Sequence, residues 1–268
     1  MDFSLILGIA VGLGMILGGF LLEGGHLMAL LLLPPFLIVV GGTIGATMAS
    51  FSLRDILNAM KTLKNSFSKK SKGDPNMVIE KISELSELCR REGLLKIEER
   101  LNDPDLASDE FLFLKEGLIL VLEGRQEEEI QYILDSDIRA FTLQRQIEIN
   151  VFESAGGFCP TMGVLGTVMG LVHVLAGDMA DTARLAASIG TAFIATLYGV
   201  GIANVIFLPI ATKLKGDLKR QKIQREMIMD GVCMLAKGEA SRNITNQLSL
   251  YFQAFPDGSK KYKEGILN

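Results

Sequence analysis

The sequence predicts an all-α, polytopic membrane protein with four transmembrane helices and a helical cytoplasmic domain. The first observation is that four uncharged runs each reach the length of about 20 residues that a spanning helix needs. The second is a charged stretch with helical spacing of its apolar residues, which separates the second run from the third. The chain of 268 residues is 49% hydrophobic and 22% charged, which suits neither a purely soluble nor a purely membrane protein. The four runs are Phe3–Leu22, Leu27–Phe51, Ser154–Gly177 and Leu185–Thr212.

These runs divide the chain into four regions. We expect transmembrane helices 1 and 2 in residues 1–50, the cytoplasmic helical domain in 51–150, transmembrane helices 3 and 4 in 151–213, and a cytoplasmic helix with a polar tail in 214–268. The first run does not have the pattern of a cleaved signal peptide, because only Asp2 precedes it and a second apolar run follows at once.

Basic residues around the runs predict the orientation in the membrane. They gather after the second and fourth runs, whereas the two short opposite loops carry little basic charge. By the positive-inside rule, both termini and the long central segment are then cytoplasmic. The basic residues are Arg54, Lys61, Lys64, Lys69, Lys70 and Lys72 after the second run, and Lys213, Lys215, Lys219, Arg220, Lys222 and Arg225 after the fourth.

The third run, around CPTMGVLGTVMGLVHVL, has features that lipid contact does not require. Gly163, Gly166 and Gly170 share a side of the predicted helix with the hydroxyl of Thr167. Small residues at such spacing let another helix backbone approach closely. Pro160 removes one backbone donor and is expected to bend the helix near its start. We therefore predict that this helix faces protein.

The fourth run supplies a matching surface. Small residues recur at every fourth position and form one ridge, and a second ridge carries further hydroxyls. Together the two helices predict a packed, partly polar interior. An alternative for each hydroxyl is a bond back to a carbonyl of its own helix. The ridges are Ala187, Thr191, Ala195, Gly199 and Ala203, and Ser188, Ala192 and Thr196.

The central segment reads as three or four helices. Asp74 followed by Pro75 predicts a helix start, and Gly93 and Gly124 predict helix ends. A long amphipathic helix from Gln126 to Asn150 is placed to continue into the third run. The basic stretch from Lys213 to Met234 is likewise expected to extend the fourth helix into the cytoplasm, and the chain from about Phe255 on to be a polar tail.

A mixed-charge surface is expected near the break at Gly93. One interpretation is a solvated face with local ion pairs, and the other is an electrostatic contact for a complementary partner. Its residues are Arg90, Arg91, Glu98, Glu99 and Arg100.

Motifs for enzymatic chemistry are absent from the sequence. It contains no nucleotide-binding P-loop, no nucleophile elbow and no Cys/His metal spacing, so we expect no catalytic residues, no metal and no cofactor. Cys89, Cys159 and Cys233 are scattered and odd in number, which predicts reduced thiols. His26 falls in an outer loop, where a surface residue is expected.

The apolar runs also lack the charge that an ion conductor would need. No Asp, Glu, Lys or Arg lies within any of the four apolar cores. If the protein conducts ions, the ion-binding carboxylate must therefore come from another subunit. His173, near the outer end of the third run, is either a packing residue or an ionisable group of a pore.

The stretches PTMGVLGTVMGLVHVL and GTAFIATLYGVGIANVIFLPIAT resemble the MotA/TolQ/ExbB family of ion-driven membrane motors. The similarity covers nearly the whole chain. The four-span layout is similar to the flagellar stator A subunits of the family rather than to TolQ and ExbB, which have three spans and a differently placed cytoplasmic loop.

This resemblance implies a homopentamer in the bacterial inner membrane. Five copies would surround a dimer of a single-span partner, MotB, whose aspartate binds the transported H⁺ or Na⁺. Thr167 and Thr196 would lie beside the ion path, with Pro160 and Pro209 shaping the third and fourth helices. Gly163, Gly166, Gly170 and Gly199 would serve helix packing.

The resemblance also implies a rotor contact. The charged positions of the family fall on Arg90 and Glu98 in RREGLLKIE, and the opposing charges would belong to the rotor protein FliG. Ion-motive force would then become rotation and torque. One departure concerns the acidic residue that many relatives carry just before the proline of the third span, because here Glu153 is displaced and Gly157 takes the nearer position.

Two other functions remain open from the sequence. One is an ExbB- or TolQ-like energising subunit within the same family. The other is a non-conducting membrane scaffold whose glycine faces only build an oligomer. An enzyme is the least favoured class, because no catalytic constellation is present.

Overall fold

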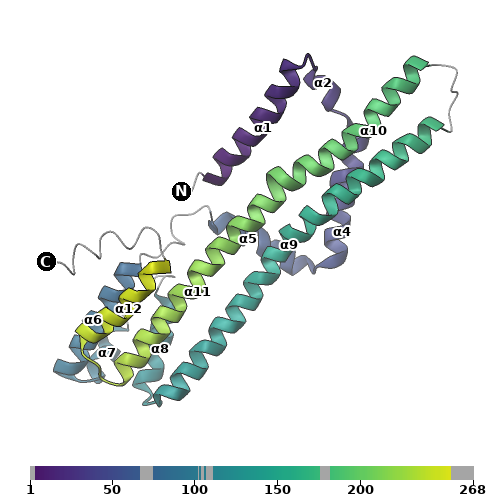
Figure 1. Ribbon diagram of the computed structural model, residues 1–268. Coiled ribbons are helices and arrows are strands. Elements are labelled where there is room, and N and C mark those ends of the chain that lie inside the picture. The colour runs from purple at the N-terminus through teal and green to yellow at the C-terminus, as the bar shows by residue number, and fades with distance from the viewer. Residues whose placement is uncertain are drawn as a thin grey trace. The chain divides into compact units, whose positions relative to one another are not determined.

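The computed structural model describes residues 4–66, 75–101, 103, 106, 111–175 and 182–254, and every regular element among them is a helix (Figure 1). The chain forms two compact units. We call residues 1–68 and 146–215 the membrane unit, and residues 69–145 and 216–268 the globular unit. The helices α9 (Glu127–Leu175) and α11 (Leu208–Ala236) contribute residues to both.

Among the described residues, four helices are long and apolar enough to cross a membrane, which confirms the predicted all-α fold with four spans. The first is α1 (Ser4–Leu22) and the second runs from Leu33 to Ser50. The third lies within α9. The fourth begins in α10 (Thr182–Ile202) and continues through the π-helical turn η4 (Ala203–Phe207) into α11.

The second span begins after a break in the uncharged run. The sequence allowed Pro34 and Pro35 either to kink the second span or to end a short outer turn, and the structure has the second arrangement: α2 (Leu27–Leu30) is a separate short helix, and Leu31 and Leu32 are not helical. The reason is that Pro34 and Pro35 have no amide hydrogens for the carbonyls one turn earlier, whereas prolines fit the first turn of a new helix. That helix consists of α3 (Leu33–Phe36), the π-helical turn η1 (Leu37–Gly41) and α4 (Gly42–Ser50).

An amphipathic helix, α5 (Leu53–Ser66), follows the second span. Asp55 lies in its first turn and Lys64 in its last, which suits the helix dipole at both ends. The hydroxyl of Ser52 accepts a hydrogen bond from the amide of Asp55, at 3.2 Å, and so caps the helix start.

Helix α9 runs without interruption from the globular unit into the third span. It continues as an α-helix through Pro160, as the predicted junction between the amphipathic segment and the third run requires. Within the membrane unit, α10 runs beside the third span of α9 (Figure 1). The predicted extension of the fourth helix is also confirmed, because α11 continues to Ala236.

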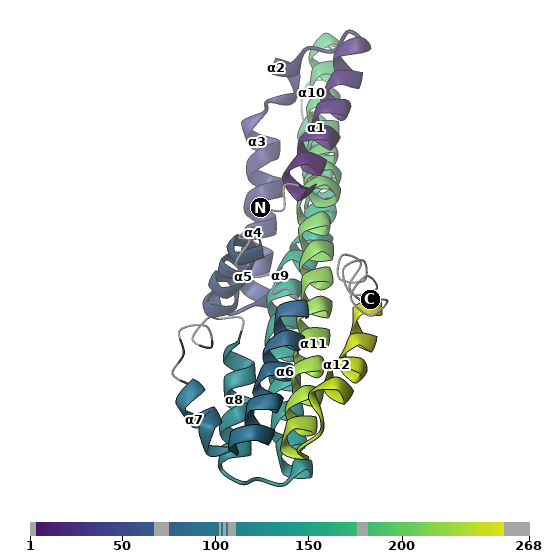
Figure 2. The same ribbon diagram turned by 90° about the vertical axis from the view of Figure 1, so that its left-hand side faces the viewer.

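The globular unit is built from α6 (Pro75–Glu92), α7 (Leu95–Arg100), α8 (Leu112–Leu122), α12 (Ser241–Ser249), the 3-10 helix η5 (Leu250–Ala254) and parts of α9 and α11. Gly93 and Gly124 have φ values of +87° and +72°, so each ends a helix as predicted. Helix α12 lies against α6 (Figure 2) and was not predicted. Its only large apolar residues, Ile244 and Leu248, are too few to stand out in a polar stretch.

Large aliphatic side chains form the core of the globular unit. They come from every one of its helices and are almost fully removed from solvent. Apolar burial of this kind is the main stabilising contribution in water-soluble folds. The largest fully buried members are Ile82, Leu85, Ile97, Leu106, Leu114, Leu118, Ile130, Leu134, Ile138, Met227 and Ile228.

Some sequence predictions concern residues that the structure does not describe. These are the cap at Asp74, the short loop between the third and fourth runs, and the tail from Phe255. The side chain of His173 also lies outside the described part, so its two interpretations stay open.

Candidate functional site

The backbones of α9 and α10 touch at Gly163 and Gly199. A Cβ atom on Gly199 would lie 2.6 Å from the carbonyl oxygen of Cys159 and 2.9 Å from the Cα of Gly163. A Cβ on Gly163 would lie 2.9 Å from the carbonyl oxygen of Ala195. Because backbone atoms cannot move aside as a flexible side chain can, only glycine permits this approach.

The other two glycines predicted for packing face alanines of α10. A Cβ on Gly166 would lie 2.8 Å from the Cβ of Ala195, and one on Gly170 would lie 2.9 Å from the Cβ of Ala192. Both alanines are buried. The glycine stripe of α9 thus packs against Ala192, Ala195 and Gly199 of α10.

Thr167 and Thr196 meet within this contact. Their Oγ1 atoms lie 2.5 Å apart, although the residues come from different helices. Thr167 Oγ1 also lies 3.1 Å from the carbonyl oxygen of Gly163 in its own helix and 3.0 Å from that of Ala192 in α10. A hydroxyl has one hydrogen to donate and two lone pairs. Thr167 can therefore donate to one carbonyl while it accepts from Thr196.

For Thr167, both interpretations of the hydroxyls hold: a polar contact between the two helices and a bond back to its own helix. Thr167 bonds back to its own helix, as the alternative reading expected, and it also bonds across to α10. Both threonine side chains are half-buried, so they keep some access to the surroundings of the membrane unit. The site is thus a small polar patch with oxygen atoms only, set in an otherwise apolar helix pair.

Each of the two prolines lies next to unusual backbone: Pro160 next to a close helix contact, and Pro209 next to an irregular helical turn. Pro160 follows Cys159, whose carbonyl oxygen faces Gly199. Pro209 is the second residue of α11, which follows the π-helical turn η4, and such turns accommodate a residue that cannot donate to the normal helix ladder. Pro209 also lines an open groove of the membrane unit with Ser4, Leu5, Asn204, Leu208, Thr212 and Lys213.

Sequence reasoning missed two tertiary hydrogen bonds of the membrane unit. Tyr198 of α10 bonds to the backbone on both sides of the break at Leu31 and Leu32. Glu148 of α9, which is 3% exposed, accepts a hydrogen bond of 2.5 Å from the hydroxyl of Thr62 in α5. The available signal was a polar group of Tyr198 within an apolar run, whereas Glu148 lies among other polar residues of the amphipathic segment, and neither pattern reveals a partner.

Arg90 and Glu98 occupy the globular unit. Arg90 lies in the last turn of α6 and Glu98 in α7, and both are exposed. Within the described residues, neither side chain forms a hydrogen bond or ion pair. Both charged groups are accessible to solvent.

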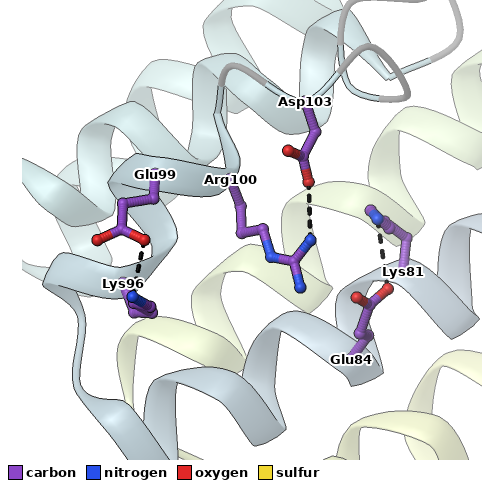
Figure 3. Close-up of polar contacts among 6 residues, drawn as sticks. All are labelled: Lys81, Glu84, Lys96, Glu99, Arg100 and Asp103. Atoms are coloured by element: carbon purple, nitrogen blue, oxygen red, sulfur yellow. Dashed lines mark hydrogen bonds and ion pairs between the residues drawn. The ribbon is translucent and has the colours of Figure 1, made fainter.

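The charged neighbours of these two residues behave differently. Lys96 pairs with Glu99 at 2.8 Å and Arg100 with Asp103 at 3.1 Å (Figure 3), and Arg91 lies 3.9 Å from Glu87. Hydrogen bonding to these carboxylates raises the pKa of Lys96 and of Arg100. The mixed-charge surface thus combines internally paired residues with two that face outward alone among the described residues.

The other residues considered in the sequence are Glu153, the three cysteines and His26. Glu153 pairs with Lys215 across α9 and α11. The three cysteines are free thiols, and His26 is an exposed residue before α2. No group of His, Cys, Asp and Glu residues in the described part of the chain is arranged to hold a metal ion.

Comparison with known sequences places the chain in a family. The sequence model of the MotA/TolQ/ExbB proton channel family matches residues 107–227, and that of the motility protein A N-terminal region matches residues 6–93. Motility protein A of Bacillus subtilis is 33% identical over 254 residues, which cover 95% of this chain and 92% of that protein. Chemotaxis protein PomA of Vibrio alginolyticus is 31% identical over 94% of this chain and 95% of its own length.

Solved structures are similar over the same length. A chain of C. jejuni MotAB aligns with a TM-score of 0.86 and 29% identity, covering 94% of this chain and 96% of that one. A chain of the flagellar MotAB stator complex from Bacillus subtilis aligns with a TM-score of 0.83, also with 29% identity, over 99% of both chains. The chain therefore belongs to the MotA/TolQ/ExbB proton channel family, as a flagellar stator subunit.

Proposed function

We propose that this stator subunit assembles with a MotB-like single-span partner and that the complex couples ion flow across the bacterial inner membrane to rotation. The observation that carries the proposal is the pair of hydroxyls, Thr167 and Thr196, at a closely packed glycine contact in spans that contain no Asp, Glu, Lys or Arg in their apolar cores. Such a wall offers oxygen atoms to a passing ion but no charge to hold it. The partner's aspartate would supply that charge.

Each part of the site then has a role. Hydroxyl and carbonyl oxygens of Thr167, Thr196 and Ala192 replace part of the ion's hydration shell beside the partner's carboxylate. Ion binding neutralises that carboxylate and ion release restores its charge. In a homopentamer around a partner dimer, this alternation would favour successive positions of the ring and so drive rotation.

The orientation in the membrane follows from charge. Basic residues after the second and fourth spans support a cytoplasmic location for both termini and for the globular unit. Ions would enter from the opposite side and leave toward the globular unit. H⁺ and Na⁺ are both compatible with oxygen ligands, so sodium concentration and pH must be varied separately to tell them apart.

Ion flux tests the borrowed carboxylate directly. We would express the full chain alone, with a MotB-like partner, and with the Asp→Asn form of that partner, and vary sodium and pH independently. We expect flux only with the intact partner. Flux from the chain alone would contradict the proposal, and the absence of flux in all three cases would favour the non-conducting scaffold.

The role of the threonine pair can be tested by removing one hydroxyl. Thr196→Val nearly preserves the volume but deletes the Oγ1 atom that lies 2.5 Å from Thr167. We expect a lower flux with the partner present. The matched control is Thr161→Val, because Thr161 is exposed and, in the part of the chain that the structure describes, its hydroxyl bonds only to the carbonyl of Phe158 in its own helix, at 2.7 Å. Equal effects of the two changes would argue against the ion path.

We also propose that Arg90 and Glu98 transmit torque to FliG. Their exposure and their lack of partners within the described residues support an intermolecular role, since a charge already paired gains less from a second partner. Arg90→Glu and Glu98→Lys should each lower swimming speed and leave ion flux intact. Reversal of the paired neighbours, Arg91→Glu and Glu99→Lys, is the matched control. Normal motility of the Arg90→Glu/Glu98→Lys double variant would refute the contact.

A further inference from the structure

The break before the second span leaves backbone groups that need a partner. In an unbroken helix, the carbonyl of Leu30 would accept from the amide of residue 34, but that residue is Pro34 and has no amide hydrogen. Leu32 is extended, with φ −113° and ψ 119°, and lies beyond the end of α2, so its amide does not donate to a carbonyl one turn earlier as it would in a continuous helix. In an apolar stretch that leads into a membrane span, water is a poor substitute for these bonds.

The Tyr198 hydroxyl meets both groups. It donates to the carbonyl oxygen of Leu30 and accepts from the amide of Leu32 at 3.2 Å. A phenol has one hydrogen to donate and lone pairs that accept, so the Tyr198 side chain supplies hydrogen bonds to both the Leu30 carbonyl and the Leu32 amide. The ring of Tyr198 packs edge-on against Phe36 of α3, with centroids 6.2 Å apart and planes at 90°, which holds the phenol in place.

Tyr198 also lies in the turn of α10 that forms the candidate ion path. Thr196, two residues earlier, reaches Thr167, and Gly199, the next residue, touches the backbone of α9. Helix α10 packs against α3 and η1 in the same region. A single helical turn is thus bound on one side to α9 and on another to the start of the second span.

We propose that Tyr198 is a positioning residue, which fixes the turn of α10 bearing Thr196 by tying it to the broken backbone at Leu30–Leu32. This inference rests on the proposed role of Thr196 in the ion path. Without the tie, α10 can rotate or slide relative to the second span, and the Thr196 hydroxyl then spends less time facing Thr167. The ion path loses affinity for its ion although every atom that lines it is still present.

The test removes only the hydroxyl. Tyr198→Phe keeps the ring that contacts Phe36, and Tyr251→Phe is the matched control, because the Tyr251 hydroxyl bonds to Asp230 at 2.6 Å in the globular unit. The full chain is assembled with its partner in membranes, and its amount is checked by immunoblot. Hydrogen exchange is followed in peptides that cover residues 27–36, and flux is measured against sodium and proton concentration.

We expect Tyr198→Phe to speed exchange at Leu32 and to raise the half-saturating ion concentration roughly 2- to 12-fold, the range that corresponds to one lost hydrogen bond. Tyr251→Phe should change neither. A merely structural role would lower maximum flux through loss of assembled complex and leave the half-saturating concentration unchanged. That result, or unchanged exchange at Leu32, would overturn the inference.

A double-variant cycle separates this inference from the function on which it rests. If Tyr198 acts through Thr196, Tyr198→Phe should add little to the shift already caused by Thr196→Val. Shifts that multiply would mean that the tie acts elsewhere and would overturn the inference alone. If Thr196→Val leaves flux unchanged, the ion-path role of Thr196 fails first, and the assignment of Tyr198 as its positioning residue fails with it.

Discussion

Different kinds of packing stabilise the interior of the membrane unit and the interior of the globular unit. In the membrane unit, the contact between α9 and α10 is made by glycines and alanines, and backbone atoms of the two helices touch. In the globular unit, the core consists of large aliphatic side chains. Water rewards the burial of a leucine, whereas lipid tails are as apolar as leucine and offer no such gain. Close approach of backbones is then the main source of attraction left in the membrane unit.

The polar contacts of the two units differ in the same sense. In the third and fourth spans, hydroxyls bond to carbonyls or to each other, as at Thr167, Thr196 and Tyr198. In the globular unit, exposed ion pairs such as Lys96–Glu99 predominate at the candidate contact surface. Neutral donors and acceptors can be satisfied without moving a full charge out of water, which explains their use in the spans. Four sets of measurements test this comparison.

The largest effect is expected in the core of the globular unit. Leu114→Ala in α8 removes a side chain with no exposed surface and should lower the free energy of unfolding by about 2–5 kcal/mol. Leu112→Ala on the same helix is the control, because Leu112 is 46% exposed. Thermal unfolding of the purified protein measures both. Similar melting temperatures for the two variants would contradict the described core.

The next largest effect should come from adding one carbon to the membrane unit. Gly199→Ala places a Cβ atom 2.6 Å from the carbonyl oxygen of Cys159, so the two helices must separate, at a cost of about 1–3 kcal/mol. Gly201→Ala, with no atom within 4 Å of its Cβ, should be tolerated or favourable to the helix. The yield of folded protein extracted in mild detergent reports the difference. If both variants extract equally well, the helix contact is not as close as described.

A pH-dependent effect is expected at a buried thiol of the globular unit. Burial, with the nearby charges of Glu127 and Asp230, raises the pKa of Cys233 from 9.0 to about 11. The neutral thiol therefore stabilises the fold below pH 9, and this contribution is lost as the pH rises through about 11. Native Cys233 should also react with an alkylating reagent at pH 8 about 100-fold more slowly than the denatured chain.

Alkylation is best followed in a Cys89→Ser/Cys159→Ser background, where Cys233 is the remaining thiol. The rate should rise about tenfold per pH unit until the pH approaches the pKa. A rate that levels off near pH 9 in the native protein would show that the thiol is not buried as described.

The smallest effect should come from an exposed ion pair. Lys96→Gln and Glu99→Gln each break the 2.8 Å contact, but both side chains are largely exposed, so solvent replaces the lost partner. We expect no resolvable change in melting temperature and no change in ion flux. A clear loss of stability would mean that this surface is more ordered than its exposure indicates, and would weaken the contrast with Arg90 and Glu98.

Much of the architecture could be predicted because it depends on neighbours in the sequence. The spans follow from runs of uncharged residues, and the ends of α6 and α8 follow from Gly93 and Gly124, whose φ values are positive. The glycines of α9 and the ridges of α10 could be recognised from their spacing alone, since residues four apart share a helix face. Helix α12 was missed, because a short polar helix gives a weak signal. The proline pair at Pro34 and Pro35 left two possibilities open, a kink in the second span or a short turn before it.

What the sequence by itself determined is which segments are helical, which of them suit lipid, and which helix faces are small. Periodicity and backbone chemistry are local, so they can be read along the chain. Only the tertiary structure decided that Tyr198 bonds to Leu30 and Leu32 and that Glu148 is buried against Thr62. These contacts join groups 86 to 168 positions apart, and spacing along one helix carries no information about such pairs.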